Sequence, residues 1–238
     1  MVFYNEDRKK VIIKDDVLNN IIDNGYCATI YRYNDDLCFK YYDRGIDYEH
    51  CLLNPYIKED LGKIDSPNLA NIKELLFKDN NKYTIDAYLL SYYEEKYQEL
   101  LEVPTDYLLY NMEEILKLTK KISEYKIRVD DLKRRNMILT DSNIVLIDPD
   151  RWYYDRSISE NEIKKANVNN IMQLFNQTIA NELDDNYKEF LLENRLYSST
   201  IADKLFPLVS NDKKAMKVLT KRLNGYKKPI DYVYSKKK

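Results

Sequence analysis

The spacing of hydrophobic positions changes about halfway along the chain. In the first half, β-forming residues gather in short runs between polar turns, a pattern typical of strands. The predicted strands span 26–33, 37–42, 70–77 and 83–93, with tight turns at Asn34-Asp35-Asp36 and at Asp79-Asn80-Asn81. Asn54-Pro55 indicates a helix start, with Asn54 as the cap and Pro55 in the first turn, and this helix is expected to end near Asp65. The first half therefore predicts a lobe of about five strands and one helix.

The second half follows the helical period instead. From Pro104 the stripe recurs at alternating steps of four and three residues, at Leu108, Met112, Ile115, Thr119 and Ile122. Two short strands are predicted next, over 136–140 and 143–147. The helical pattern resumes by about Ser159 and continues over 187–196 and 199–206. A β-rich half before an α-rich half predicts the α+β class.

The sequence argues against a membrane-spanning protein and against a secreted one. Among the 238 residues, 44% are hydrophobic and 33% are charged, and no run approaches the roughly 18 apolar residues of a membrane span. The N-terminus lacks the basic and apolar regions of a secretory signal, which favours a cytoplasmic location, in the producing cell or, for an exported effector, in a host cell.

The few histidines and cysteines narrow the chemistry further. A single histidine, His50, excludes a multi-histidine metal site and leaves acid–base work to carboxylates, Lys or Tyr. Cys27, Cys38 and Cys51 are odd in number and form no C-x-x-C pair, so we expect no disulfide framework and no zinc site.

Charge is unevenly distributed. Segment 211–238 holds ten Lys or Arg against two Asp, a local balance of +8 in a chain whose net charge is −2. Such a segment could meet an anionic partner such as a membrane surface, a nucleic acid or an acidic protein, but the pattern favours the simpler explanation of a solvated basic face.

The densest group of candidate catalytic residues lies around the two predicted C-terminal strands. Asp131 and Asn136 are five residues apart, and Asp148 follows the second strand. Carboxylate and amide oxygens are the ligands that Mg²⁺ prefers. This arrangement resembles the protein kinase superfamily, in which an Asp and an Asn five apart are followed by a hairpin and a metal-binding Asp.

The resemblance assigns a role to each of these residues. Asp131 would be the catalytic carboxylate that accepts the proton of the acceptor hydroxyl, while Asn136 and Asp148 would hold Mg²⁺ beside ATP. Lys133 matches the lysine of the Ser/Thr-type catalytic loop and would stabilise charge on the transferred phosphoryl group.

The N-terminal half carries further matching positions. Lys40 lies on a predicted strand, and Glu59 follows nineteen residues later on the predicted helix, which suits the ion pair that positions the ATP phosphates; Glu49 is a rival for this role. Gly25 stands where the glycine-rich loop belongs. The hinge that contacts adenine would lie at Ser91, Tyr92 and Tyr93.

The sequence departs from the kinase pattern in several places. Only Gly25 remains of the glycine-rich loop, Val129-Asp130 precede the catalytic Asp instead of His-Arg, and the D-F-G motif reads Asp148-Pro149-Asp150. No A-P-E motif follows. These features are similar to the reduced kinase domains of bacterial effectors and to kinases of the aminoglycoside phosphotransferase type.

The resemblance therefore implies a single bilobal kinase-like domain over 1–238, with an N-lobe at about 10–93, a hinge at about 91–96 and a reduced, mostly helical C-lobe at about 97–238. The expected activity is transfer of the ATP γ-phosphoryl group to a protein Ser or Thr. Three alternatives stay open: a small-molecule kinase, a nucleotidyl transferase on the same fold, and a pseudokinase that acts as a scaffold.

Overall fold

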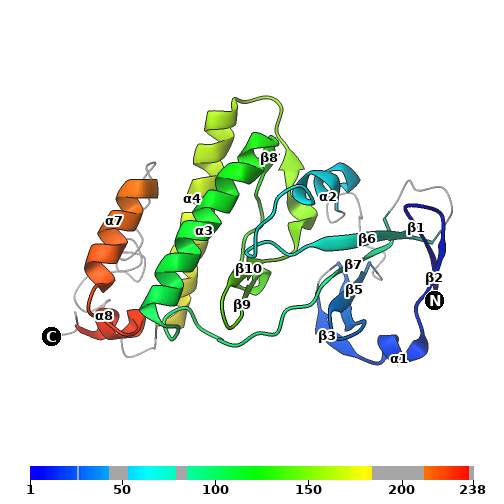
Figure 1. Cartoon of the computed structure of the whole chain (residues 1–238), viewed down its shortest axis with the longest axis horizontal. Coiled ribbons are helices and arrows are strands. Elements are labelled where there is room, and N and C mark those ends of the chain that lie inside the picture. Colours follow the sequence, from blue (N-terminus) through cyan, green and yellow to red (C-terminus); the bar gives the residue numbers. More distant parts are fainter. Residues whose placement is uncertain (26, 43–52, 79–84, 184–211, 236–238) are drawn as a thin grey trace. The chain divides into compact units, whose positions relative to one another are not determined.

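The computed structural model describes residues 1–25, 27–42, 53–78, 85–183 and 212–235. These residues confirm the α+β class, because an antiparallel sheet dominates the N-terminal part and helices dominate the rest (Figure 1). The segments predicted to be helical at 187–196 and 199–206, the turn at Asp79, the rival Glu49 and His50 lie outside the described residues.

The chain divides into two compact units, each described by itself. The first, called the sheet unit, comprises Met1–Asp65, Leu69–Tyr93 and Asp148–Tyr153. The second, called the helical unit, comprises Ser66–Asn68, Glu94–Ile147 and Tyr154–Lys238.

A seven-stranded antiparallel sheet forms the sheet unit, in the order β2-β1-β6-β7-β5-β4-β3. Its strands are β1 (Val2–Asn5), β2 (Lys10–Ile12), β3 (Ile21–Asn24), β4 (Thr29–Arg32), β5 (Leu37–Tyr41), β6 (Ile72–Phe77) and β7 (Ala87–Ser91). Strands β4, β5, β6 and β7 lie within the four predicted strand ranges, whereas β3 lies outside them. The pair β1–β2 extends the sheet beyond the expectation, because the Asn5 side chain accepts the Asp7 and Lys9 amides and builds a turn from charged residues.

Two helices accompany the sheet. The expected one is α2 (Pro55–Leu61), whose Asn54 side chain accepts the Tyr56 amide as its cap. It ends earlier than predicted, at Leu61. The other, α1 (Asp15–Leu18), is a single turn that the sequence pattern did not predict.

One face of the sheet carries an apolar core. Phe39 packs edge-on against Phe3, with ring centroids 5.6 Å apart, and lies 5.8 Å from the Tyr31 ring. The other members of this cluster are Ile13, Val17, Leu76, Ala87 and Leu89. Because side chains alternate along a strand, the neighbours of Phe39 on β5, Cys38 and Lys40, face the opposite side.

In the helical unit, α3 (Thr105–Glu124) and α4 (Glu160–Glu182) pack side by side (Figure 1). The predicted stripe of α3 is fully confirmed as buried, from Leu108 to Ile122. Ser159 starts α4 through a capping box with Glu162. The remaining elements are β8 (Ile127–Arg128), η2 (Arg134–Asn136), β9 (Met137–Leu139), β10 (Ile144–Leu146), η3 (Pro149–Arg151), β11 (Tyr153–Tyr154), α7 (Asp212–Leu223) and α8 (Pro229–Ser235).

The short segment Ser66–Asn68 joins this unit through one buried amide. The Asn68 side chain donates to the Asn111 Oδ1 atom on α3 at 2.9 Å and to the Ile144 carbonyl on β10 at 2.8 Å. Asn111 Oδ1 in turn accepts the Ile144 amide. The hairpin β9–β10 is thereby fixed to α3 by polar contacts that exclude water.

Two findings bear on the composition argument. Cys27 is disulfide-bonded, which goes against the expectation of no disulfide framework, while Cys38 is a free, buried thiol. Among the described residues, no helix has both the length and the apolar character that a membrane crossing requires.

Candidate active site

Lys40 is the centre of a buried charged cluster in the sheet unit. Its Nζ lies 2.5 Å from Asp148 Oδ1 and 2.8 Å from Asp150 Oδ2. Only 8% of the Lys40 side chain and 9% of the Asp150 side chain are exposed, against 39% for Asp148. Lys40 and Asp148 were assigned roles separately from the sequence. Their side chains are in contact although 108 positions separate them in the chain.

The strand pairing explains why tyrosines surround this lysine. Lys40 on β5 pairs in register with Tyr88 on β7, so both side chains face the same side of the sheet. Tyr42, two positions after Lys40, faces that side as well. The ammonium lies 5.6 Å from the Tyr88 ring centroid and 5.8 Å from the Tyr42 ring centroid, a range in which aromatic rings attract cations.

Burial and charge act against each other on Lys40. Burial alone would lower the pKa of the Lys40 ammonium, but the Asp150 and Asp148 carboxylates outweigh it and raise this pKa above its usual value. Burial also raises the pKa of Asp150 to about 6, although Lys40 opposes the shift. The Tyr88 hydroxyl donates to Asp150 Oδ1 at 2.8 Å, and burial raises the pKa of Tyr88.

Glu59 stands apart from this cluster, so the expected Lys40–Glu59 ion pair is wrong. The Glu59 side chain is 72% exposed and lies 3.9 Å from the Lys63 ammonium. The helix α2 buries Ile57 and Leu61, and Glu59 lies between them in sequence. A step of two residues turns about 200° around a helix, which directs Glu59 to the opposite face.

Asp131 begins the expected catalytic loop in the helical unit. Its carboxylate lies 2.5 Å from the Lys133 ammonium, and its carbonyl accepts the Asn136 side-chain amide at 3.1 Å. Asn136 is buried, and its own carbonyl accepts the Ile147 amide at 2.9 Å. The chain reaches Asp148 one residue later.

Backbone strain occurs at both expected aspartates. Asp131 has a φ of 49° and Asp148 a φ of 62°, and among the described non-glycine residues only Arg8 and Lys126 share this left-handed conformation. Such conformations cost about 1 kcal/mol or more outside glycine and persist where the surroundings fix them, often at functional sites.

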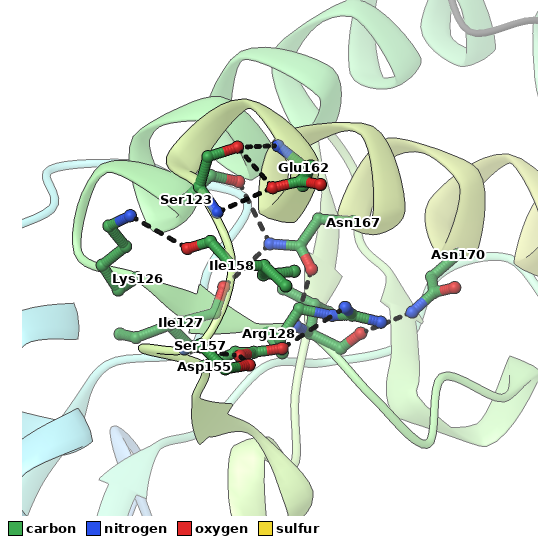
Figure 2. Close-up of polar contacts among 12 residues, drawn as sticks. Ser123, Lys126, Ile127, Arg128, Asp155, Ser157, Ile158, Glu162, Asn167 and Asn170 are labelled. Carbon is green, nitrogen blue, oxygen red and sulfur yellow. Dashed lines mark hydrogen bonds and ion pairs between the residues drawn. The ribbon is translucent and has the colours of Figure 1, made fainter.

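Amides on α4 fix the chain that leads into the loop (Figure 2). The buried Asn167 side chain accepts the Val129 amide at 2.9 Å and donates to the Ile127 carbonyl at 2.8 Å and to Ser123 Oγ at 3.1 Å. Asn170, one turn on, donates to the Val129 carbonyl at 2.8 Å. Sequence reasoning missed these residues, because asparagines inside a helical pattern carry no distinctive signal.

A small cavity opens beside Asp131. It has a volume of about 180 Å³ and lies between the loop and α4. Its lining residues are Asp130, Asp131, Leu132, Asn170, Gln173, Leu174 and Gln177. This volume is below the usual range for sites that hold whole drug-sized molecules and suits a single side chain.

Ser91, Tyr92 and Tyr93 of the expected hinge, and Gly25 of the expected glycine loop, belong to the sheet unit. The Ser91 amide donates to the Asn71 carbonyl and the Tyr92 amide to the Asp36 carbonyl, so neither is available to a base. Arg32 stacks 3.2 Å above the Tyr92 ring centroid. Among the described residues, no backbone hydrogen bond of Tyr93 is found.

Gly25 directly follows β3, in the hairpin that joins β3 to β4. Its amide donates to the Ala28 carbonyl at 2.9 Å, and a Cβ atom at Gly25 would lie 3.1 Å from that oxygen. This close approach explains why glycine occupies the position.

The donor chemistry at Asn136 and Asp148 suits Mg²⁺. Asn136 Nδ2 donates to the Asp131 carbonyl, so Asn136 Oδ1 is the acceptor atom of this amide, and Asp148 Oδ1 faces the Lys40 ammonium. The described residues include no group of three or more His, Cys, Asp and Glu side chains placed to hold a metal ion. Asn136 in the helical unit and Asp148 in the sheet unit each carry hard oxygen atoms of the type that Mg²⁺ prefers.

Comparisons with known proteins assign no family. No protein-family model matches the chain, and no curated protein matches it significantly.

Proposed function

We propose that the chain is an ATP-dependent phosphotransferase with a bilobal, protein-kinase-like fold, which transfers the γ-phosphoryl group to a Ser or Thr hydroxyl of a protein. One observation carries the proposal. Lys40 and Asp148, assigned from sequence to ATP and to Mg²⁺ respectively, form an ion pair with a buried lysine side chain, although 108 positions separate them.

The catalytic loop supports the same assignment. A phosphoryl-transfer site needs a carboxylate near the attacking hydroxyl, and the fold holds Asp131 by its backbone while its side chain stays partly accessible. The cavity beside Asp131 suits a single side chain, which favours a protein acceptor over a large small molecule.

The proposed reaction is a direct displacement. The acceptor hydroxyl gives its proton to the Asp131 carboxylate, and its oxygen forms a bond to the γ-phosphorus. The bond from that phosphorus to the β,γ-bridging oxygen breaks, and ADP leaves with the bonding electrons. Lys133 stabilises the charge on the moving phosphoryl group, Lys40 binds the phosphates of ATP, and Asn136 and Asp148 would hold the Mg²⁺ that neutralises them.

Transfer from ATP labelled at either the γ- or the α-phosphate tests the proposal, with the protein itself and a generic protein substrate as acceptors. We expect label from the γ-position only, lost in Asp131→Asn and retained in Asp141→Asn, which neutralises an exposed carboxylate in the β9–β10 turn. Label from the α-position would indicate a nucleotidyl transferase. Absence of both labels and of metal-dependent ATP binding would leave the pseudokinase reading.

The basic C-terminal segment adds a separate prediction about partners. The lysines Lys213, Lys214, Lys217 and Lys221 of α7 are exposed. An anionic partner for 211–238 stays a prediction, and binding to acidic vesicles or nucleic acid that weakens steeply with salt is the measurement that checks it.

A further inference from the structure

Asp150 has both carboxylate oxygens engaged inside the sheet unit. Its Oδ2 faces the Lys40 ammonium at 2.8 Å, and its Oδ1 accepts the Tyr88 hydroxyl at 2.8 Å. Building on the proposed function, we propose that Asp150 is the positioning residue that anchors the phosphate-binding Lys40, in place of a glutamate on α2.

Lys40 needs an anchor other than Asp148. The side chain of Asp148 is 39% exposed, and its carboxylate is the one assigned to Mg²⁺, so its charge is shared with the metal when the nucleotide is bound. The Asp150 carboxylate is 9% exposed and lies between Lys40 and Tyr88. A buried ammonium without a dedicated counter-charge is costly, and the Asp150 carboxylate supplies that charge.

The helix α2 offers no substitute within the described residues. It contacts the rest of the sheet unit through its apolar face, with Ile57 and Leu61 buried, and through Lys58, which pairs with Glu6. Glu59 is on the opposite, exposed face, near Lys63.

The anchor and the metal-binding residue therefore belong to one short segment. Pro149 joins Asp148 to Asp150 and fixes its own φ, and the Pro149 carbonyl accepts the amide of the buried Trp152. A segment this constrained holds Asp148 and Asp150 at a fixed spacing around Lys40. The position of Lys40 consequently depends on this segment, and among the described residues no side chain of α2 pairs with the Lys40 ammonium.

Double-mutant cycles in thermal unfolding test the anchor without reference to catalysis. We combine Lys40→Met with Asp150→Asn, and separately with Glu59→Gln, which neutralises a carboxylate in the same way. The first pair is expected to be strongly non-additive in Tm and the second additive. Additive behaviour of the first pair, or coupling in the second, would overturn the proposal.

Nucleotide kinetics test the positioning role. Asp150→Asn is expected to raise the KM for ATP at least tenfold with a smaller effect on kcat, whereas Glu59→Gln leaves both within twofold. If Asp150→Asn fails to fold, Tyr88→Phe removes only the hydroxyl that holds Asp150 and is expected to raise the same KM severalfold. An unchanged KM in the folded variant contradicts the positioning role.

The two hypotheses fail in distinguishable ways. If the unmodified protein neither binds Mg-ATP nor transfers phosphate, the proposed function is wrong, and the role of Asp150 in nucleotide binding fails with it. Coupling of Lys40 to Asp150 in the unfolding cycle would then establish a structural ion pair alone.

Discussion

The Lys40 cluster and the Asp131 loop are held by different kinds of interaction. In the sheet unit, side-chain charges hold one another: an ammonium lies between two carboxylates and beside two tyrosine rings. In the helical unit, neutral amides of α4 hold the backbone that leads to Asp131, and the Asp131 carboxylate stays partly accessible.

This difference suits the two proposed tasks. Binding phosphates requires a fixed positive charge, and a buried ion-pair cluster provides one. Accepting a proton from an acceptor hydroxyl requires a carboxylate that substrate can reach, so the fold places this side chain without enclosing it. The fold can do so because hydrogen bonds to the neighbouring backbone do not occupy the carboxylate itself.

The largest expected effect separates the two regions by function. Asp131→Asn should lower phosphoryl transfer by about 10²–10⁴-fold, the usual contribution of a general base, while metal-dependent ATP binding persists. Asp148→Asn should abolish that binding as well, because it removes a proposed Mg²⁺ ligand and a partner of Lys40. Calorimetric ATP titration measures binding, and the transfer assay measures activity. If Asp131→Asn and Asp148→Asn had the same effects on binding and on transfer, the proposed difference in function between the two regions would be wrong.

A structural variant tests whether neutral amides hold the loop. Asn167→Leu leaves the Val129 amide, the Ile127 carbonyl and Ser123 with no side-chain amide to bond, so we expect a loss of about 2–4 kcal/mol in the free energy of unfolding. Asn169→Leu, at an exposed position of the same helix, should change it by less than about 0.5 kcal/mol. Urea unfolding checks both, and a small effect at Asn167 would show that the loop is held elsewhere.

The pH dependence of stability is expected to reveal the cost of the buried Glu182 charge in the helical unit. Glu182 accepts the Leu100 and Leu101 amides, and burial raises its pKa to about 7, with Arg134 lowering it and Glu99 raising it. A raised pKa means that the folded protein holds the proton more tightly than the unfolded chain does. The resulting stability is complete below about pH 4.5 and is lost as the pH rises through about 7.

Glu182→Gln isolates this contribution. We compare the free energy of unfolding of the unmodified protein with that of the variant. The difference, unmodified protein minus variant, should fall by roughly 2 kcal/mol between pH 4.5 and 7.5, after allowance for partial exposure of Glu182. Urea unfolding at several pH values measures it. A difference that stays constant, or that grows with pH, would show that the amide contacts govern the carboxylate more than burial does.

The smallest expected effect concerns the start of α4. Ser159→Ala removes the side-chain half of the capping box and should cost about 1 kcal/mol, whereas Ser159→Asp keeps a cap and should cost less. Thermal unfolding measures both variants. Helix α4 carries Asn167 and Asn170, which hold the chain before Asp131. If Ser159→Ala lowered transfer activity by more than its small destabilisation explains, the Asp131 loop would depend on the start of α4 more strongly than these contacts indicate.

Much of the fold follows from local pattern. The buried stripe of α3, the Asn54 cap of α2 and the Asn34 turn before β5 were all predicted, because each depends on residues within one or two turns of chain. The strands β1, β2 and β3 and the turn α1 were missed, since they are short and mostly exposed. The disulfide at Cys27 was not expected either, because a cysteine count says little about pairing.

The candidate site was predicted in part. The sequence placed Lys40, Asp131, Asn136 and Asp148 as a set by spacing, and the structure brings Lys40 to Asp148 and Asn136 to Asp131 within its two units. It placed Glu59 wrongly, because a spacing of nineteen residues does not state which face of a helix a side chain occupies. Spacing also gave no role to Asp150, which had registered only as a departure from D-F-G.

By itself the sequence determined the elements, the class and the residue types available for chemistry, because hydrophobic period, caps and turn residues act over short distances. Only the tertiary structure decided which charges meet. Lys40 and Asp150 are 110 positions apart, and their pairing depends on the register of β5 with β7, on the burial that removes water from the ammonium, and on the proline that fixes the segment after Asp148. A buried charge takes whichever counter-charge the fold brings within reach, and that choice is made by packing across the whole unit rather than by the local chain.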